Sequence, residues 1–364
     1  MFYINVPAIK RSFTFKSPDM PDASLASEGD TWFKSDTKQA FSFKGGRWLE
    51  IPLIPVDTDP YKTAFIIGGV ANTGFVADID RYEFGNDSVS ETGISLSVPT
   101  CLMSSFASAS EAYASGGTHP GYQYSRGLTV LSFANEAEQS VLKALETPRA
   151  GAAGFNCSNR GYTSNGADER FGALNTIERL DFSSDTFSVV CNTDLNKRRC
   201  AGFNSITTGF SAGGCSGMFE NTDSVNALTF TQDTYKARSL FLVSSRKRDI
   251  AACNSVRHGY LIGGYAVGGQ ALSTLDIAKF GSDMSEYIHQ ATLGSTLTGA
   301  CGFNSKSHGF AATGLRNGDT MTQQSYRFEF MSDLSMSSTT VDVASKSKFN
   351  ATSPDSTDNN RFLF

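Results

Sequence analysis

Histidine and cysteine are the residues of this chain that could carry metal or nucleophilic chemistry, and their spacing argues against both. The 364 residues include only four His, at positions 119, 258, 289 and 308. The seven Cys form no Cys-x-x-Cys pair and no closely spaced Cys/His set, which favours buried free thiols over a disulfide framework or a zinc site. His258 and His308 occupy equivalent places in a repeat, so duplication explains them as structural turn residues.

Sequence motifs for catalysis or phosphate binding are also missing. The chain has no Gly-x-Gly-x-x-Gly, no phosphate loop, no Gly-x-Ser-x-Gly and no His-Glu-x-x-His. Its Gly-Gly pairs recur without a following helix, which indicates a structural role. We therefore predict a protein that is not an enzyme, with no catalytic residues, no metal site and no cofactor.

The composition narrows the class of protein further. With 40% apolar residues and 18% charged residues, against a usual ~25%, the chain does not match a disordered protein. A net charge of -5 provides no basic field for nucleic acid. No run approaches the ~20 apolar residues of a membrane-spanning helix, and residues 1–16 lack the apolar core of a secretory signal. We expect a soluble protein that neither inserts into membranes nor binds nucleic acid.

An internal repeat of about 50 residues organises nearly the whole chain. One series places an aromatic residue before Gly-Gly or its equivalent: Phe65, Tyr113, Tyr162, Phe210, Tyr260, Phe310 and Phe362. A second series ends an alternating apolar stretch in Phe: Phe84, Phe133, Phe182, Phe230, Phe280 and Phe330. A third precedes the Gly-Gly strand: Phe106-Ala107, Phe155-Asn156, Phe203-Asn204, Cys253-Asn254, Phe303-Asn304 and Phe349-Asn350.

Each repeat contains the signals of four antiparallel strands. Small residues mark an innermost strand, an Asn and a following Gly mark a hairpin turn, and the Gly pair ends the second strand. The alternating stretch and a weaker strand after it complete the unit. Four antiparallel strands in about 50 residues are typical of a propeller blade, so the fold class is all-β.

The repeat resembles the kelch repeat. The segment from Pro148-Arg149 through Phe155-Asn156 to Gly166 carries the resemblance best, and Arg199 and Arg248 approximately repeat its Arg. The outer strand lacks the Trp that kelch repeats usually place there. The resemblance covers about residues 62–364 and implies a kelch-like β-propeller. Galactose-oxidase-like enzymes share this ring and use a copper site of two Tyr and two His with a Tyr-linked Cys, a set that cannot be assembled here.

The two ends of the chain suggest a shared closing blade. Residues 31–51 match an outer hairpin, with Phe33 in step with the second series, and residues 345–364 match two inner strands. We therefore predict seven blades over residues 31–364, the seventh combining both ends. A ring of six blades with a separate N-terminal hairpin is the alternative.

Residues 1–30 remain outside this ring as an extended anchoring arm. Its apolar residues need a surface to pack on, either a neighbouring subunit or another protein of an assembly, and simple disorder is the alternative. The expected partner-binding residues are Phe2, Tyr3, Ile4, Val6, Phe13 and Phe15.

The loops that follow each Gly-Gly pair vary most between repeats and are expected on one face of the ring. Exposed Tyr, Asn and Arg side chains there could stack on a sugar or contact a protein, and ordinary solvated loops are the alternative. The candidate ligand-binding residues are His119, Tyr122, Tyr124, Arg126, Arg170, Phe171, Asn221, Tyr265 and Arg316.

Residues 29–51 resemble a hairpin of tailed-bacteriophage tail and fibre proteins. Gly29-Asp30-Thr31-Trp32-Phe33, Asp36-Thr37, the aromatic strand Phe41-Ser-Phe43 and Gly46-Arg47-Trp48 match it in order. The resemblance implies a structural virion protein, assembled in the host cytoplasm, that docks to other tail proteins through residues 1–30. Its propeller would attach to a host-surface glycan or protein. A kelch-type carbohydrate-binding or galactose-oxidase-like protein and an intracellular kelch scaffold are the alternatives.

Overall fold

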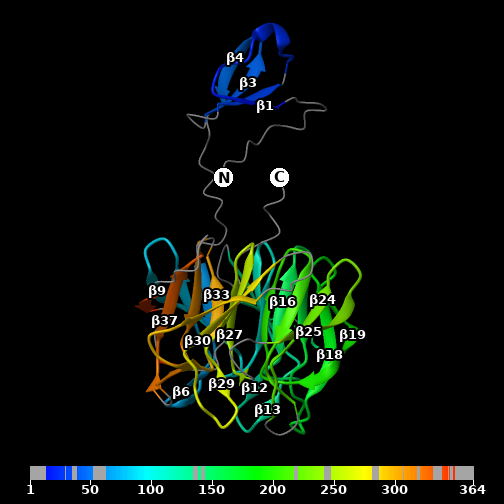
Figure 1. The fold of residues 1–364 in the computed structure, drawn as a ribbon, viewed down its shortest axis with the longest axis vertical. Helices are drawn as coiled ribbons and strands as arrows, with labels where there is room; N and C mark the ends of the chain where they lie inside the picture. Colours follow the sequence, from blue (N-terminus) through cyan, green and yellow to red (C-terminus); the bar gives the residue numbers. More distant parts are fainter. Residues whose placement is uncertain are drawn as a thin grey trace. The chain divides into compact units, whose positions relative to one another are not determined.

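The computed structural model divides the chain into two compact units, Met1–Asp59 and Pro60–Phe364 (Figure 1). The residues that it describes are 14–28, 30–34, 39–51, 63–133, 138–140, 144–216, 220–241, 247–280, 287–305, 307–317, 320–330, 338–342, 344 and 347–348. The expected boundary at residue 30 therefore lies nearer residue 59.

The N-terminal unit is a four-stranded sheet. Its strands are β1 (Thr14–Ser17), β2 (Thr31–Lys34), β3 (Gln39–Lys44) and β4 (Arg47–Ile51), in the order β1-β2-β3-β4, with a 3-10 turn η1 at Ala23–Leu25. The prediction that residues 31–51 form the outer strands of a closing blade is wrong, because β2 pairs in parallel with β1.

Aromatic packing explains why this unit forms its own sheet. Trp32 is buried, stacks on Phe41 at 4.6 Å between ring centroids and meets Trp48 edge to face at 6.1 Å. The indole N–H groups of Trp32 and Trp48 donate to the backbone oxygens of Ser17 (3.2 Å) and Pro21 (3.1 Å). The two Trp of the chain thus fasten residues 17–21 to the sheet, a constraint that the repeat spacing does not reveal.

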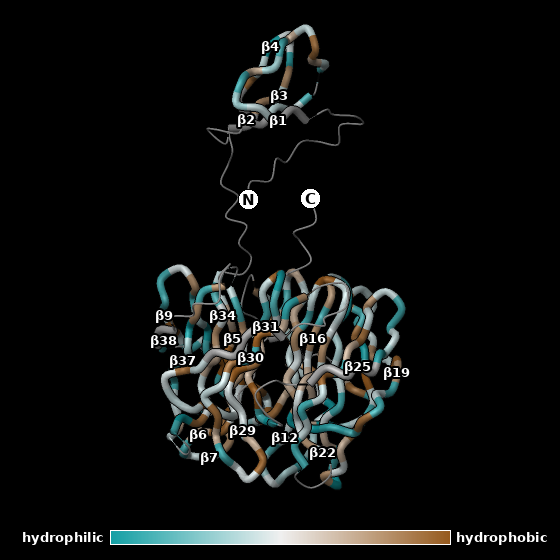
Figure 2. Tube along the Cα trace, in the orientation of Figure 1, coloured by the Kyte–Doolittle hydropathy of each residue, from teal (hydrophilic) through white to brown (hydrophobic). Residues whose placement is uncertain are grey.

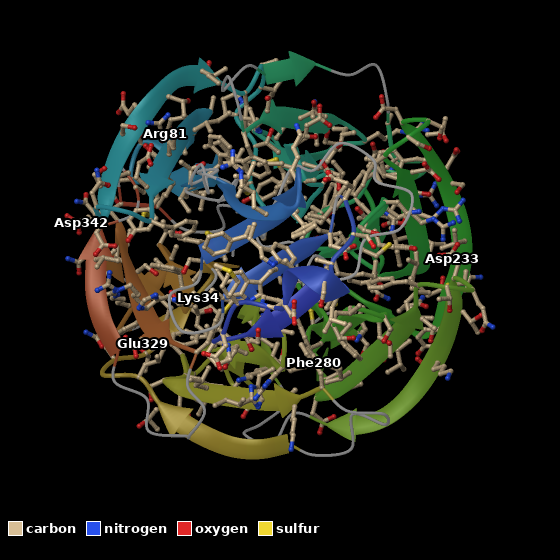
Figure 3. All side chains as sticks on the ribbon, turned by 90° about the horizontal axis from the view of Figure 1, so that it is seen from above. Lys34, Arg81, Asp233, Phe280, Glu329 and Asp342 are labelled. Atoms are coloured by element: carbon tan, nitrogen blue, oxygen red, sulfur yellow. The ribbon has the colours of Figure 1, made fainter. Side chains whose placement is uncertain are left out.

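The second unit contains six sheets of the blade type within its described residues, arranged around a central axis (Figure 3). The first three comprise β5 (Thr63–Ile67), β8 (Asp78–Glu83) and β9 (Ser88–Ser95); β10 (Ser104–Ala107), β11 (Glu111–Ser115), β14 (Leu128–Ser132) and β15 (Glu138–Ser140); and β16 (Ala153–Cys157), β17 (Arg160–Ser164), β18 (Leu174–Asp181) and β19 (Thr186–Lys197). The last three comprise β20 (Ala201–Asn204), β21 (Thr208–Ala212), β24 (Ser224–Thr229) and β25 (Thr234–Phe241); β27 (Ala251–Asn254), β28 (His258–Ile262), β30 (Thr274–Lys279) and β31 (Tyr287–Thr292); and β33 (Cys301–Asn304), β34 (His308–Ala312), β37 (Gln324–Glu329) and β38 (Ser338–Asp342).

Short strands lie in the loops that follow the Gly-Gly strands or just before an inner strand. They are β6 (Val70–Ala71) with β7 (Gly74–Phe75), β12 (Thr118–His119) with β13 (Gln123–Tyr124), β22 (Cys215–Ser216) with β23 (Glu220–Asn221), β26 (Lys247–Arg248) with β29 (Tyr265–Ala266), and β32 (Leu297–Thr298) with β35 (Leu315–Arg316) and β36 (Thr320–Met321). The architecture is therefore all-β, as the repeat predicted.

The Phe and Tyr series form the hydrophobic layers between neighbouring sheets, and hydrophobic residues recur along these strands in Figure 2. Tyr113 stacks on Phe182 of the next sheet at 5.0 Å, and Tyr162 stacks on Phe230 at 5.3 Å. The same contact joins the sixth sheet to the first, because Phe84 lies 5.5 Å from Phe310. The first and sixth sheets are thus direct neighbours.

The inner strands are as crowded as their small residues predicted. A Cβ added to Gly202 would lie 2.0 Å from the backbone oxygen of Gly154 in the preceding sheet. The equivalent Gly302 would place its Cβ 1.9 Å from Ala252 O. Glycine is required here because the backbones of adjacent inner strands are in contact.

The repeated Asn residues do not serve the hairpin turns as predicted. Asn204, Asn254 and Asn304 end the inner strands, and their side chains link successive sheets. The N–H of Asn156 donates to Asn204 Oδ1 at 3.4 Å, and the N–H of Asn204 donates to Asn254 Oδ1 at 3.2 Å. The N–H of Asn254 donates in turn to Asn304 Oδ1 at 3.5 Å. The series therefore fixes the spacing of the blades.

The end of the described chain lies against the first sheet. Lys348 is completely buried and forms ion pairs with Asp78 (2.9 Å) and Asp80 (2.8 Å) of β8. Its backbone also bridges to Thr322 in the sixth repeat. Phe349 and Phe362, which were assigned to the inner strands of a seventh blade, lie outside the described residues.

Candidate functional site

The short strands and the segments that precede the inner strands meet at one end of the propeller, which we call the loop face. Cys101 bridges to Thr118, Ala150 to Ala167 and Arg198 to Cys215, so each loop pairs with the segment that enters its own blade. β26 with β29 and β32 with β35 repeat this pairing in the fifth and sixth sheets. The variable loops are therefore held on a rigid frame.

Tyr122, Tyr124 and Phe171 form an aromatic patch on this face, from the loops of the second and third sheets. Tyr122 is 70% exposed and Phe171 is 54% exposed. The rings of Tyr124 and Phe171 meet edge to face at 6.0 Å between centroids. The structure thus brings two of the predicted ligand-binding residues, Tyr124 and Phe171, into contact, and Tyr122 is exposed in the same loop as Tyr124.

Two members of the aromatic patch have a strained backbone. Tyr122 and Phe171 both have φ of 60°, a region that bulky side chains rarely adopt. The corresponding loops of the first and fifth sheets place Gly74 and Gly268 in the positive-φ region. Such strain costs on the order of 1–3 kcal/mol and concentrates at ligand clamps.

Polar groups hold the loop of Phe171 in place. Arg198 Nη1 donates to the backbone oxygen of Phe171 at 3.1 Å. Asp168 Oδ1 accepts from the N–H groups of Arg170 (3.0 Å) and Gly172 (2.8 Å), and the exposed Arg170 precedes Phe171 in the chain. Sequence reasoning missed the supporting roles of Arg198 and Asp168, because both act through hydrogen bonds to backbone groups of the loop, which a repeat pattern does not reveal.

The phenol of Tyr124 remains protonated near neutral pH. Burial is the main cause that raises its pKa above the ordinary value, and the nearby Arg198 and Arg199 oppose the shift. A protonated phenol can donate a hydrogen bond as well as accept one. The patch therefore combines apolar ring faces with a polar group.

Asn221 and Tyr265 lie together in the loops of the fourth and fifth repeats, where Asn221 supports the backbone of the neighbouring loop. Asn221 is 4% exposed, and its Nδ2 donates to the backbone oxygen of Tyr265 at 2.9 Å. Arg248 donates to Asn221 Oδ1 at 3.0 Å and lies over the Tyr265 ring at 5.6 Å. These contacts stiffen the face and leave Asn221 buried.

Three other predicted residues have contacts of their own outside the aromatic patch. Arg126 Nε donates to the Leu145 oxygen at 2.6 Å. The Arg316 guanidinium lies 4.5 Å from the Tyr326 ring centroid. Burial lowers the pKa of His119. Of the predicted arm residues, Phe2, Tyr3, Ile4, Val6 and Phe13 lie outside the described part of the chain, and Phe15 belongs to β1.

The propeller axis contains a cavity of about 120 Å³ lined by inner-strand residues of five sheets. At its entrance Leu102, Gly151, Arg199, Asp249 and Gly299 all have φ between 55° and 63°. From Gly151 onward, each N–H donates to the oxygen of the preceding residue in this set, and Arg199 Nη1 pairs with Asp249 Oδ2 at 2.9 Å. Sequence reasoning noted Arg199 but missed Asp249, although both stand in step with Gly151.

The titratable groups of the described residues bear on metal binding and on thiol reactivity. Among the described residues, no group of three His, Cys, Asp or Glu side chains could hold a metal ion. All seven Cys are free, and five are buried. Burial raises the pKa of the Cys101 thiol to about 12. No helix within the described ranges is long and apolar enough to cross a membrane.

Comparison with known proteins supports the fold assignment. No protein-family model and no curated protein matches the chain. Among solved structures, that of the protein YjhT is similar, with a TM-score of 0.62 and 12% sequence identity over 77% of this chain and 98% of that chain. This match supports a β-propeller fold and provides no evidence for the bacteriophage resemblance of residues 29–51.

Proposed function

We propose that this protein is a non-enzymatic binding protein whose propeller recognises a glycan through Tyr122, Tyr124 and Phe171 on the loop face. The strained, exposed placement of Tyr122 and Phe171 carries the proposal. Fold stability alone would favour Gly or Asn at these positions. Ligand recognition gives a reason to keep two aromatic rings there.

The chemistry of the aromatic patch suits a sugar. Exposed aromatic rings bury the apolar C–H face of a pyranose, and polar groups at the border bond its hydroxyls. The protonated Tyr124 phenol and the exposed Arg170 supply such groups. Rigid aromatic residues make this contact at a low cost in conformational entropy.

Replacing Phe171 by Gly is expected to weaken glycan binding by about 30-fold or more, as a central aromatic contact contributes about 2 kcal/mol. The same change should leave the midpoint of thermal unfolding equal to or higher than that of the unchanged protein, because glycine adopts the positive φ without strain. A glycan array identifies the ligand, and calorimetry with scanning fluorimetry measures both effects.

Val267→Ala is the matched control, because Val267 is also an exposed apolar loop residue, at 67%, but lies in the fifth repeat. It should bind normally. Full affinity in Phe171→Gly would refute the aromatic patch as the site, and turnover of a sugar or stoichiometric copper would refute the non-enzymatic assignment.

We further propose that the protein is a bacteriophage tail or fibre component that attaches the virion to its host. The resemblance of residues 29–51 supports this, as does the separate fold of residues 14–51. Phe2, Tyr3, Ile4 and Val6 would contact other virion proteins.

We also propose that the six neighbouring sheets constitute the whole ring, and that the segment around Lys348 completes the first sheet.

Deleting residues 1–59 is expected to leave the propeller folded and binding its ligand, while incorporation into particles falls to background. The two compact units of the chain give the reason. Circular dichroism and pull-down on the ligand test the first part, and immunoblots of purified virions test the second. Normal incorporation of the deletion variant would contradict the anchoring role.

A further inference from the structure

In three sheets a buried basic side chain pairs with a buried carboxylate. Arg149 pairs with Glu178, and both side chains are completely buried. Lys247 pairs with Asp276 at 3.0 Å, again with both side chains buried. Lys348 pairs with Asp80 in the same way. A buried charge is tolerated because its partner is buried beside it.

The fourth sheet keeps the buried cation of such a pair but lacks the carboxylate. Lys197 is the equivalent cation and is completely buried, but Asn226 takes the place of the carboxylate. Asn226 pairs in register with Ser211, whose backbone oxygen accepts from Lys197 Nζ at 3.1 Å, and Ser224 Oγ lies 3.5 Å from the same Nζ. Because the equivalent side chains of the third and fifth sheets contact their buried cation, we infer that the Asn226 amide faces Lys197.

Negative charge is missing from this space. Among the described residues, no carboxylate forms an ion pair with Lys197, and burial lowers the pKa of its ammonium group. Burial raises the pKa of the Cys200 thiol to about 11, so this thiol is neutral. Asn226 is 4% exposed, and its buried Nδ2 has no hydrogen-bond partner. The charged donor Lys197 Nζ and the neutral donor Asn226 Nδ2 thus occupy a place where the neighbouring sheets hold a carboxylate.

We propose that Lys197 and Asn226 bind a small monovalent anion of the size of chloride, which replaces the carboxylate of the third and fifth sheets. The ammonium supplies the charge and the Asn226 amide supplies a second N–H donor. An ion of this size substitutes for one carboxylate oxygen, whereas a larger oxyanion would need the space of a whole side chain.

Thermal unfolding of the full chain tests this site in sodium chloride against sodium gluconate at equal ionic strength. Chloride is expected to raise the midpoint by about 2 °C or more, since a ligand that binds only the folded state stabilises it. The Asn226→Asp variant should lose this difference and unfold at a higher temperature in both salts, because a carboxylate then pairs with Lys197.

Crystals soaked in sodium bromide provide a direct readout that does not depend on any variant. An anomalous peak between Lys197 Nζ and Asn226 Nδ2 is expected. Equal midpoints in the two salts together with no peak would overturn the proposal and indicate a bound water or a neutral lysine. A neutral lysine would instead make stability rise from pH 7 to pH 10 in either salt.

Discussion

Lys348→Met is expected to destabilise the propeller by about 3–5 kcal/mol, the usual cost of breaking a buried ion pair on one side. Lys348 is completely buried, and its Nζ lies 2.8 Å from Asp80 and 2.9 Å from Asp78. Methionine fills the aliphatic volume but leaves the Asp80 carboxylate buried without its cation. Urea unfolding followed by fluorescence measures the loss.

The double variant Lys348→Met, Asp80→Asn separates charge from packing. Removing the stranded carboxylate should restore a large part of the lost stability, because a neutral amide is far less costly to bury than an unpaired charge. A loss below about 1 kcal/mol in the single variant would contradict the claim that Lys348 stabilises the first sheet.

The location of Lys348 also indicates which sheet the last described residues belong with. It belongs to the same series as Arg149 and Lys247, each of which pairs within the sheet that its own segment enters. By this rule Lys348 belongs with the first sheet, which has three described strands, β5, β8 and β9. The direct contact of Phe84 with Phe310 agrees with this assignment.

Most of the propeller could be predicted from the sequence because its packing layers repeat. The Phe and Tyr series mark strands that lie in equivalent places, and Phe182 and Phe230 pack between sheets as a repeated core requires. The assignment of residues 31–51 failed because periodicity alone cannot exclude a strand that finds another partner. Trp32 and Trp48, through their indole bonds to residues 17–21, decide that pairing.

The candidate site was only partly predictable, for a related reason. Variable loops identified Tyr122, Tyr124 and Phe171, but the sequence does not report a positive φ at an aromatic residue. It also does not distinguish a buried supporting Asn221 from an exposed one. Burial and backbone conformation depend on contacts between repeats, which no single repeat contains.

Gly202→Ala is expected to destabilise the propeller by about 3 kcal/mol or more, at or above the upper end of the usual cost of overpacking. The new Cβ would lie 2.0 Å from Gly154 O, a backbone atom that cannot move without shifting the neighbouring inner strand. The Asn156 N–H bond to Asn204 Oδ1 fixes the spacing of the same two strands.

Gly85→Ala is the matched control, because a Cβ there meets nothing within 4 Å and its φ lies outside the positive region. It should change the urea midpoint little, whereas Gly202→Ala should lower the midpoint strongly or prevent folding. Equal midpoints for the two variants would show that the inner strands can separate. Contact between the inner backbones would then not be what requires glycine at this position of the repeat.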